Sequence, residues 1–163
     1  PDMVLKLSSL LNYMLYECNM PLVPLEKEVK YIGDYVSLEK LRYGKKLDLS
    51  VEISGAIQEH QIAPLLLLPF IENSFKHGAS QDSKRPWIRL NIWVDEHMLH
   101  LQIENSLEEL GAKEDEYSYT KGIGLKNVRR RLELLYKEQY ELIIRQEASF
   151  FVYLKLHLKQ QNP

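Results

Sequence analysis

The hydrophobic period of the chain changes at Lys46, and this change limits the folds that the chain can adopt. Before Lys46, apolar residues recur every three to four positions in residues 4–16 and 25–43, which is typical of amphipathic helices. After Lys46, apolar and polar residues alternate, as in strands with one buried face. Residues 87–95 and 98–105 are two such strands joined by a tight turn. We therefore expect two N-terminal helices followed by a sheet built from hairpins.

The rest of the chain completes an α+β pattern. The further segments expected are, in order, a strand over 47–53, a helix over 65–78, a helix over 124–137, and strands over 140–146 and 150–158. Consecutive hairpins favour an antiparallel sheet with helices on one side over a doubly wound parallel sheet. The expected fold is a two-layer α/β sandwich. Its sheet is mixed and mostly antiparallel, with helices on one face and an additional N-terminal helical segment.

Composition argues against several classes of protein. The 163 residues suit one domain, and the net charge of −2 gives no electrostatic reason to bind nucleic acid or an anionic membrane. A single cysteine, Cys18, cannot form an internal disulfide, and it is interpreted as a structural thiol. The longest apolar run, residues 63–71, is much shorter than the roughly 20 residues of a membrane helix.

The polar residues of the segment 69–78 form the densest group with chemical potential. On a helix, Asn73, Lys76 and His77 lie at positions i, i+3 and i+4, so they share one face. An amide oxygen beside a cation suits a hard metal ion and the phosphates that the ion bridges, because Mg²⁺ accepts one or two protein oxygens and keeps its other waters. Without further support, a solvated polar face explains this group equally well.

A glycine pair, Gly122 and Gly124, begins the helix expected over 124–137. Glycines at a helix N-terminus let backbone N–H groups approach an anion, although one such pair is weak evidence. The pair follows a polar segment, residues 106–121, which is long for a loop in a compact domain and so is either functional or disordered. Three arginines at 129–131 could suggest nucleic acid, but the apolar stripe of the same helix favours a solvated face.

Together these motifs resemble the catalytic domain of sensor histidine kinases. Glu72-Asn73-Ser74-Phe75-Lys76-His77-Gly78 resembles their N box, and Gly122-Ile123-Gly124-Leu125-Lys126-Asn127 resembles their second glycine box. The segments Leu7 to Tyr13 and Leu25 to Gly44 are similar to the LytS/YehU-like branch of the family. The resemblance covers nearly the whole chain and implies the Bergerat ATP-binding fold.

The resemblance also implies roles for individual residues. Asn73 would ligate Mg²⁺, and Asn73, Lys76 and Glu72 would be the catalytic residues. The residues implied in ATP binding are Asn73, Lys76, His77, Asn105, Gly122, Gly124 and Leu125. Residues 106–121 would form the ATP lid. The expected activity is transfer of the γ-phosphoryl group of ATP to a histidine on a dimerisation domain, and from there to a response regulator.

The sequence departs from the family pattern at the adenine box. The family places an aspartate followed by glycines after the middle strand, where the carboxylate accepts a hydrogen bond from the adenine amine. This chain has Asn105-Ser106-Leu107 there, without aspartate or glycine. Asn105 can accept through its amide oxygen, or it caps the strand without touching a nucleotide. A degenerate, nucleotide-free module that signals by protein contact is therefore the alternative function.

A second departure concerns the phosphoacceptor. No histidine precedes His60, so the acceptor helix of the family is expected to lie outside this chain. We expect residues 1–22 to be the end of the dimerisation region and residues 23–163 to be the catalytic domain. The first residue is Pro1 and not methionine, which suggests a fragment. The resemblance implies that the fragment is the cytoplasmic part of a membrane-anchored homodimer. Hydrolytic members of the fold carry a glutamate four residues before the metal-binding asparagine, and Pro69 at that position predicts little ATP hydrolysis.

Overall fold

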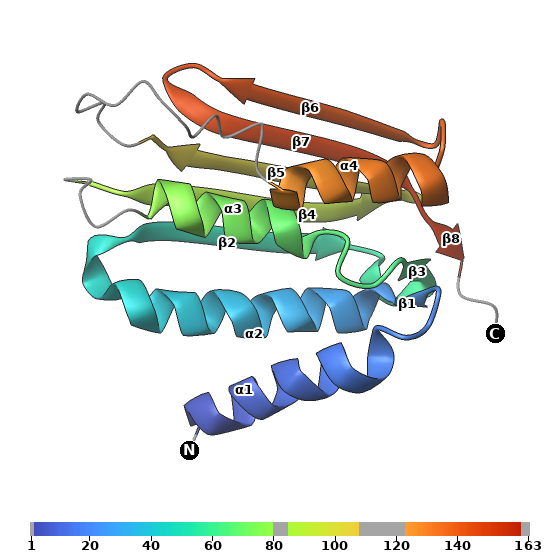
Figure 1. The fold of residues 1–163 in the computed structure, drawn as a ribbon, viewed down its shortest axis with the longest axis horizontal. Coiled ribbons are helices and arrows are strands. Elements are labelled where there is room, and N and C mark those ends of the chain that lie inside the picture. The colour runs from blue at the N-terminus through green and yellow to red at the C-terminus, as the bar shows by residue number, and fades with distance from the viewer. Residues whose placement is uncertain (1, 80–84, 108–122, 161–163) are drawn as a thin grey trace.

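The computed structural model describes residues 2–79, 85–107 and 123–160 (Figure 1). Its elements are, in chain order, α1 (Asp2–Asn12), the π-helical turn η1 (Tyr13–Glu17), β1 (Val23–Pro24), α2 (Leu25–Tyr43), the 3₁₀ turn η2 (Gly44–Lys46), β2 (Asp48–Gly55), the 3₁₀ turn η3 (Ile57–Glu59), β3 (His60–Ile62), α3 (Leu68–Gly78), β4 (Trp87–Asp95), β5 (Met98–Ser106), α4 (Ile123–Leu135), β6 (Tyr140–Gln146), β7 (Ser149–His157) and β8 (Lys159–Gln160).

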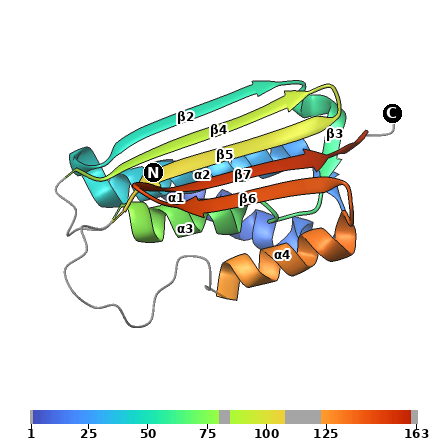
Figure 2. The same ribbon diagram turned by 90° about the horizontal axis from the view of Figure 1, so that it is seen from above.

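The main sheet has the strand order β2-β4-β5-β7-β6. The pair β2 and β4 is parallel, and the other neighbours are antiparallel. The helices α2, α3 and α4 lie on one face of this sheet, as the two views in Figures 1 and 2 show. Strands β4, β5 and β7 bury every second residue against those helices. The predicted α+β sandwich with a mixed, mostly antiparallel sheet is thus confirmed.

Helix α2 has the predicted bounds because both ends have strong stop signals. Pro24 precedes the helix with an extended backbone, and Gly44 ends it with φ of 63°, a value that glycine adopts without strain. The hairpin of β4 and β5 also matches the prediction, and Glu96 in its turn has φ of 52°. These elements give the fold its rigid frame.

The predicted start of the third helix was wrong. Residue 65 was expected in this helix, but α3 begins at Leu68, and Leu65 has φ of 53°, which no right-handed helix contains. Residues 63–67 instead form a loop, called here the 63–67 loop, with Leu66 and Leu67 fully buried. An unbroken apolar run gives no period from which to place this boundary.

A second, three-stranded sheet of order β1-β3-β8 was not predicted. Its strands have two or three residues each, too few to show an alternating pattern. Strand β2 was expected to be half buried, but Val51 and Ile53 are 38% and 39% exposed because β2 is an edge strand of the main sheet.

Helix α1 packs along α2 and leaves a broad apolar side exposed. The large apolar side chains exposed in the first 20 residues are Met3, Val4, Leu5, Leu7, Leu11, Met14, Leu15, Tyr16 and Met20. Within the described residues, none of the helices combines the length and the hydropathy that crossing a membrane requires.

Candidate functional site

Helix α3 separates a buried side from a polar side. The residues expected to face the sheet from the helical spacing, Leu67, Leu68, Ile71 and Phe75, are buried, and so is Phe70, which was not predicted. On the polar side, Glu72 and Lys76 are exposed, and Asn73 and His77 are half buried. The Nδ2 atom of Asn73 is buried and makes no hydrogen bond within the described residues. A buried amide without a partner costs free energy, so it marks a position where a ligand or water would complete the pairing.

A pair of carboxylates lies beside this polar side. Burial, and then repulsion from the Glu39 carboxylate of α2, raise the pKa of Glu72. Glu39 also contacts Arg42 with an Nη1–Oε2 distance of 3.7 Å. Burial and the same Glu39 carboxylate raise the pKa of the Tyr35 phenol. The sequence analysis named Glu72 but missed Glu39, because the contact joins two helices and no local spacing reports it.

Asn105 lies where the C-terminal end of α3 meets β5. Its side chain is fully buried, and its Nδ2 atom donates a hydrogen bond of 2.8 Å to the carbonyl of Ser106. Its Oδ1 atom is buried without a hydrogen-bond donor among the described residues. A Cβ atom at Gly78 would lie 2.5 Å from the Cβ of Asn105, so a side chain at this position of α3 would displace Asn105. The close approach of Gly78 therefore holds Asn105 in place.

Ser106 fixes the same junction from the strand side. Its hydroxyl donates to the carbonyl of Gly78 over 3.0 Å and accepts a hydrogen bond of 3.0 Å from the Trp87 amide. The sequence analysis assigned Ser106 to the start of a loop, but it is the last residue of β5 and is buried. The serine is structural, because it bonds the end of α3 to the first residue of β4.

The second motif is described only in part. Gly122 and residues 108–121, the segment expected to form a lid, lie outside the described residues. Gly124 lies in the first turn of α4, and a Cβ atom there would meet nothing within 4 Å. Leu125 is buried in the hydrophobic core rather than placed on a polar face. Helices α3 and α4 are in contact, so the described part of the second motif lies on a helix that neighbours α3.

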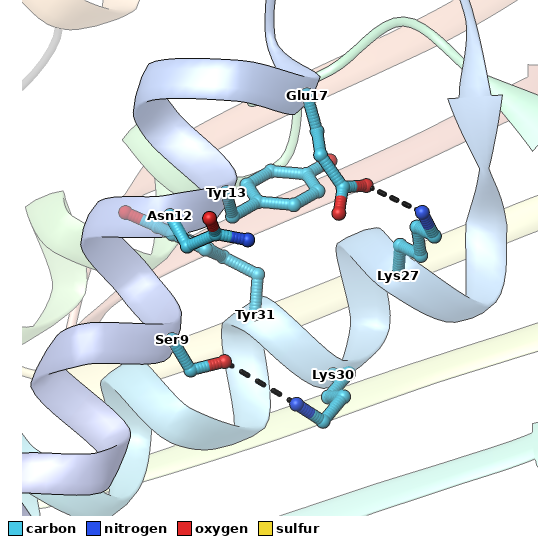
Figure 3. Close-up of a pocket in the computed structure, with 7 residues that line it drawn as sticks. All are labelled: Ser9, Asn12, Tyr13, Glu17, Lys27, Lys30 and Tyr31. Atoms are coloured by element: carbon cyan, nitrogen blue, oxygen red, sulfur yellow. Dashed lines mark hydrogen bonds and ion pairs between the residues drawn. The ribbon is translucent and has the colours of Figure 1, made fainter.

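Two cavities lined by described residues lie away from this site. One of about 200 Å³ lies between α1 and α2 and has a polar rim (Figure 3). A second, of about 390 Å³, is formed by residues around the β6–β7 hairpin, including Glu141 and Lys155. No group of three or more histidine, cysteine or acidic residues within the described ranges could hold a metal ion. A single asparagine ligand, as predicted at Asn73, is compatible with that finding.

Solved histidine kinase structures have the same fold. The histidine kinase domain of the blue-light activated kinase EL346 of Erythrobacter litoralis aligns with a TM-score of 0.60 and 18% identity, covering 95% of this chain and 77% of that domain. The nucleotide-free catalytic domain of ThkA aligns with a TM-score of 0.58 and 12% identity, covering 86% of this chain and 97% of that one. At such low identity these likenesses show the fold alone.

Sequence relatives decide the family. A family model described as histidine kinase matches residues 1–47. The sensor protein LytS of Bacillus anthracis is 24% identical over 147 residues, which cover 82% of this chain and 25% of that protein. The sensor protein kinase HptS of Staphylococcus aureus is 35% identical over 89 residues, which cover 55% of this chain and 17% of that kinase. The chain is a LytS-like sensor histidine kinase catalytic domain. It spans about a quarter of the length of the LytS proteins that it matches.

Two features of this LytS-like domain could not be read from its sequence motifs. The contact of Gly78 with Asn105 joins residues 27 positions apart, and the bond of Ser106 to Gly78 joins the same two segments. The local signal that could have pointed to them is Gly78 at the end of the helix. A glycine at such a position either forms a turn or permits the close approach of another segment.

Proposed function

We propose that this domain binds Mg-ATP between α3 and the start of α4 and donates its γ-phosphoryl group to a histidine of a dimerisation domain, for relay to a response regulator. The observation that carries the proposal is the pair of buried amide atoms without partners, Oδ1 of Asn105 and Nδ2 of Asn73. Support also comes from full-length ShkA, which was solved in complex with AMPPNP. That chain aligns with a TM-score of 0.58 and 12% identity over 99% of this chain and 36% of its own length.

The adenine end of the site would be Asn105. Its Nδ2 atom is occupied by the Ser106 carbonyl, so Oδ1 is left as a buried acceptor that suits an N–H donor such as the adenine amine. Gly78 and Ser106 hold the side chain from two directions. A guanine base presents a carbonyl where adenine presents its amine, so the same acceptor would discriminate against GTP.

The phosphate end would be the polar side of α3. Asn73 lies five residues before Gly78, about 7.5 Å along the helix axis, which separates the two ends of the site. Rotation of the Asn73 amide by 180° exchanges its nitrogen and oxygen, so the buried position can present an oxygen. Mg²⁺ held by that oxygen would neutralise phosphate charge. Lys76 and His77 would contact phosphate or ribose, and Gly122, Gly124 and Leu125 would shape the approach of the lid.

Phosphoryl transfer rather than hydrolysis fits the residues around Asn73. Pro69, one turn before Asn73, carries no base that could activate water. Glu72 projects about 100° away from Asn73 around the helix, so it is poorly placed to activate water beside the metal ion. Of the histidines in the described residues, His60 and His97 lie at the turn end of the sheet and contact each other. The phosphoacceptor would therefore be on the dimerisation domain, to which residues 1–22 would belong, with residues 23–163 as the catalytic domain.

One titration separates this function from the alternative of a nucleotide-free signalling module. The alternative is favoured by Asn105 and the missing glycines of the adenine box. Calorimetric titration of the 163-residue protein with AMPPNP, with and without Mg²⁺, should show binding that strengthens with the metal and is weaker for the guanine analogue. Absence of binding at millimolar nucleotide in both conditions would reject ATP binding and leave the signalling module. No acid-labile phosphate should appear on the protein itself after incubation with labelled ATP.

A further inference from the structure

A buried carboxylate of α2 joins the N-terminal segment to the loop that leads into α3. Glu28 is fully buried, and its Oε2 atom accepts two hydrogen bonds. The hydroxyl of Tyr13 in η1 donates one over 2.7 Å, and the backbone amide of Leu65 in the 63–67 loop donates the other over 2.9 Å. One atom therefore contacts segments that lie 15 positions before and 37 positions after it.

The 63–67 loop is held from its other side by α4. The guanidinium of Arg131 donates to the carbonyl of Pro64 over 2.7 Å and to the carbonyl of Leu65 over 3.0 Å. The hydroxyl of Tyr136 accepts a hydrogen bond of 2.9 Å from the Ala63 amide. Leu65 has φ of 53°, which is unfavourable for a branched side chain and persists only where the surroundings impose it. Glu28 and Arg131 are thus what keeps the loop in this conformation.

Among the described residues, the N-terminal segment makes polar contacts with α2 both at the surface and in the interior, and Figure 3 shows two at the surface. The surface contacts are Lys30 to Ser9 at 3.3 Å and Lys27 to Glu17 at 2.8 Å. Such exposed contacts contribute little to stability. Tyr13 is buried, its ring lies 4.9 Å from that of Tyr31, and its hydroxyl bonds to a buried carboxyl oxygen. Loss of a donor to a buried acceptor costs more than loss of an exposed contact.

The buried carboxyl group of Glu28 connects these partners through one oxygen atom. Burial raises the pKa of Glu28, and the bonds from Tyr13 and Leu65, the Leu67 amide and the nearby Arg131 oppose that rise. Its other oxygen, Oε1, has no hydrogen bond within the described residues, so the donors on Oε2 carry much of the compensation. A buried carboxylate that loses one of its few donors is costly, and its remaining partners shift to replace the donor.

We propose that Glu28 is a positioning residue for the nucleotide site: it sets the 63–67 loop, and hence the start of α3, according to whether Tyr13 is seated against it. This inference rests on the proposed function, because the site that it positions is the polar side of α3. The segment 2–17 therefore influences nucleotide affinity without touching the nucleotide. The effect would pass through the hydrogen bonds from Tyr13 and Leu65 to Glu28. Helix α4 contacts the same loop through Arg131.

The test compares single hydroxyl deletions in the 163-residue protein. Tyr13→Phe removes the bond to Glu28 and keeps the ring; Tyr31→Phe removes a neighbouring hydroxyl that is not a partner of Glu28. Lys27→Met is a second control that breaks the surface ion pair between η1 and α2. Mg-AMPPNP affinity is measured by calorimetry at a temperature at which every variant is folded. Hydrogen exchange of the amides of residues 65–72 is measured without nucleotide.

We expect Tyr13→Phe to weaken Mg-AMPPNP by about fivefold, at the low end of usual coupling between sites, and to speed exchange at Leu65 and in the first turn of α3. Both controls should resemble the parent in both measurements. Parental affinity and parental exchange in Tyr13→Phe would overturn the proposal, as would a lower melting temperature without either change. If the parent protein binds no nucleotide, the proposed function fails, and the exchange comparison still confirms or refutes the positioning role of Glu28.

Discussion

The two ends of α3 differ in how their buried polar groups are paired by hydrogen bonds. At the N-terminal end, the backbone groups of the 63–67 loop are paired with side chains from other elements, including Glu28 and Arg131. At the C-terminal end, Ser106 pairs with the backbone, but Oδ1 of Asn105 remains without a donor among the described residues. Nδ2 of Asn73 is likewise unpaired on the polar side between the two ends.

Oε1 of Glu28 also lacks a hydrogen bond among the described residues, but the other oxygen of that group has two donors. On the proposed function, the remaining difference separates groups that hold the fold from groups that would bind a ligand. A buried polar atom with its partners in place stabilises one conformation, and its loss should lower stability. A buried polar atom without a partner already costs free energy, and its removal should affect binding far more than folding. Substitutions at each location test whether stability or nucleotide binding changes more.

The largest effect is expected at Asn73. Asn73→Ala should weaken Mg-dependent ATP binding by several kcal/mol, which is more than about a hundredfold, because the ion that neutralises the triphosphate loses its protein ligand. The free energy of unfolding should change by less than about 0.5 kcal/mol, since the amide nitrogen has no bond to lose. Calorimetry and urea unfolding measure the two quantities.

The control for Asn73 is Asn91→Ala, which removes an amide from a β4 position that alternates with the residues buried against the helices. Its nucleotide affinity should equal that of the parent protein. If Asn73→Ala binds as the parent does, with parental unfolding, then Asn73 is not the metal ligand.

Gly78 is the next strongest test, at the C-terminal end of α3. Gly78→Ala should destabilise the protein by about 1–3 kcal/mol, the usual range for overpacking, because the new Cβ would lie 2.5 Å from that of Asn105. It should also weaken ATP binding by displacing Asn105. Gly33→Ala in α2 is the matched control: a Cβ there meets nothing within 4 Å, so this change should stabilise the helix by up to about 1 kcal/mol. Equal effects of the two changes would contradict the close packing at Gly78.

Substitution of Arg131 tests whether its hydrogen bonds stabilise the 63–67 loop at the N-terminal end of α3. Arg131→Lys keeps the charge but cannot donate to both loop carbonyls with a planar fork, so unfolding free energy should fall by about 1–2 kcal/mol. The control Arg130→Lys changes an exposed residue of the same helix and should have an effect below about 0.5 kcal/mol. A comparison of urea midpoints at constant slope distinguishes them. If Arg131→Lys is as stable as the parent protein, the two guanidinium hydrogen bonds are not needed to hold the 63–67 loop.

Substitution of Asn105 should change the free energy of ATP binding by about 1 kcal/mol. Asn105→Asp should tighten ATP binding about fivefold, because a carboxylate accepts a stronger hydrogen bond from the adenine amine. The same change loses the donor to the Ser106 carbonyl, so stability without nucleotide should fall by about 1 kcal/mol. Asn105→Ala should weaken ATP and reduce the preference over GTP. If both variants bind ATP and GTP as the parent does, Asn105 is structural.

The same two ends show what the sequence could and could not predict. The bounds of helix α2 were predicted because Pro24 and Gly44 lie at the two ends of its apolar stripe. The polar side of α3 was predicted because Asn73, Lys76 and His77 follow helical spacing. The start of α3 was not, since four leucines at 65–68 carry no period and only tertiary bonds hold Leu65 at positive φ.

Contacts between distant segments account for the other omissions. No role was predicted for Glu28 from the sequence, and its burial was missed. Its position on the stripe of Leu25 and Ile32 was the available signal, because a carboxylate on an apolar stripe needs buried partners. The partners themselves come from η1 and the 63–67 loop, and no local pattern specifies which distant segment supplies a hydroxyl or an amide.

The smallest expected effect is a pH dependence at Glu72. Burial and the Glu39 carboxylate raise its pKa in the folded protein above the usual 4.5, so the folded state binds the proton more tightly than the unfolded state does. This contribution to stability is complete below pH 4.5 and is lost as pH rises through the folded pKa. Glu72→Gln should therefore raise the unfolding free energy at pH 7 by less than about 1 kcal/mol, because Glu72 is partly exposed to solvent, with the gain shrinking towards pH 4. Urea unfolding between pH 4 and 7 measures the gain, and Glu133→Gln on the exposed side of α4 removes an equal charge away from Glu39. A gain at Glu72 that is constant across this range, or matched by Glu133→Gln, would show that the repulsion between α2 and α3 has no energetic consequence.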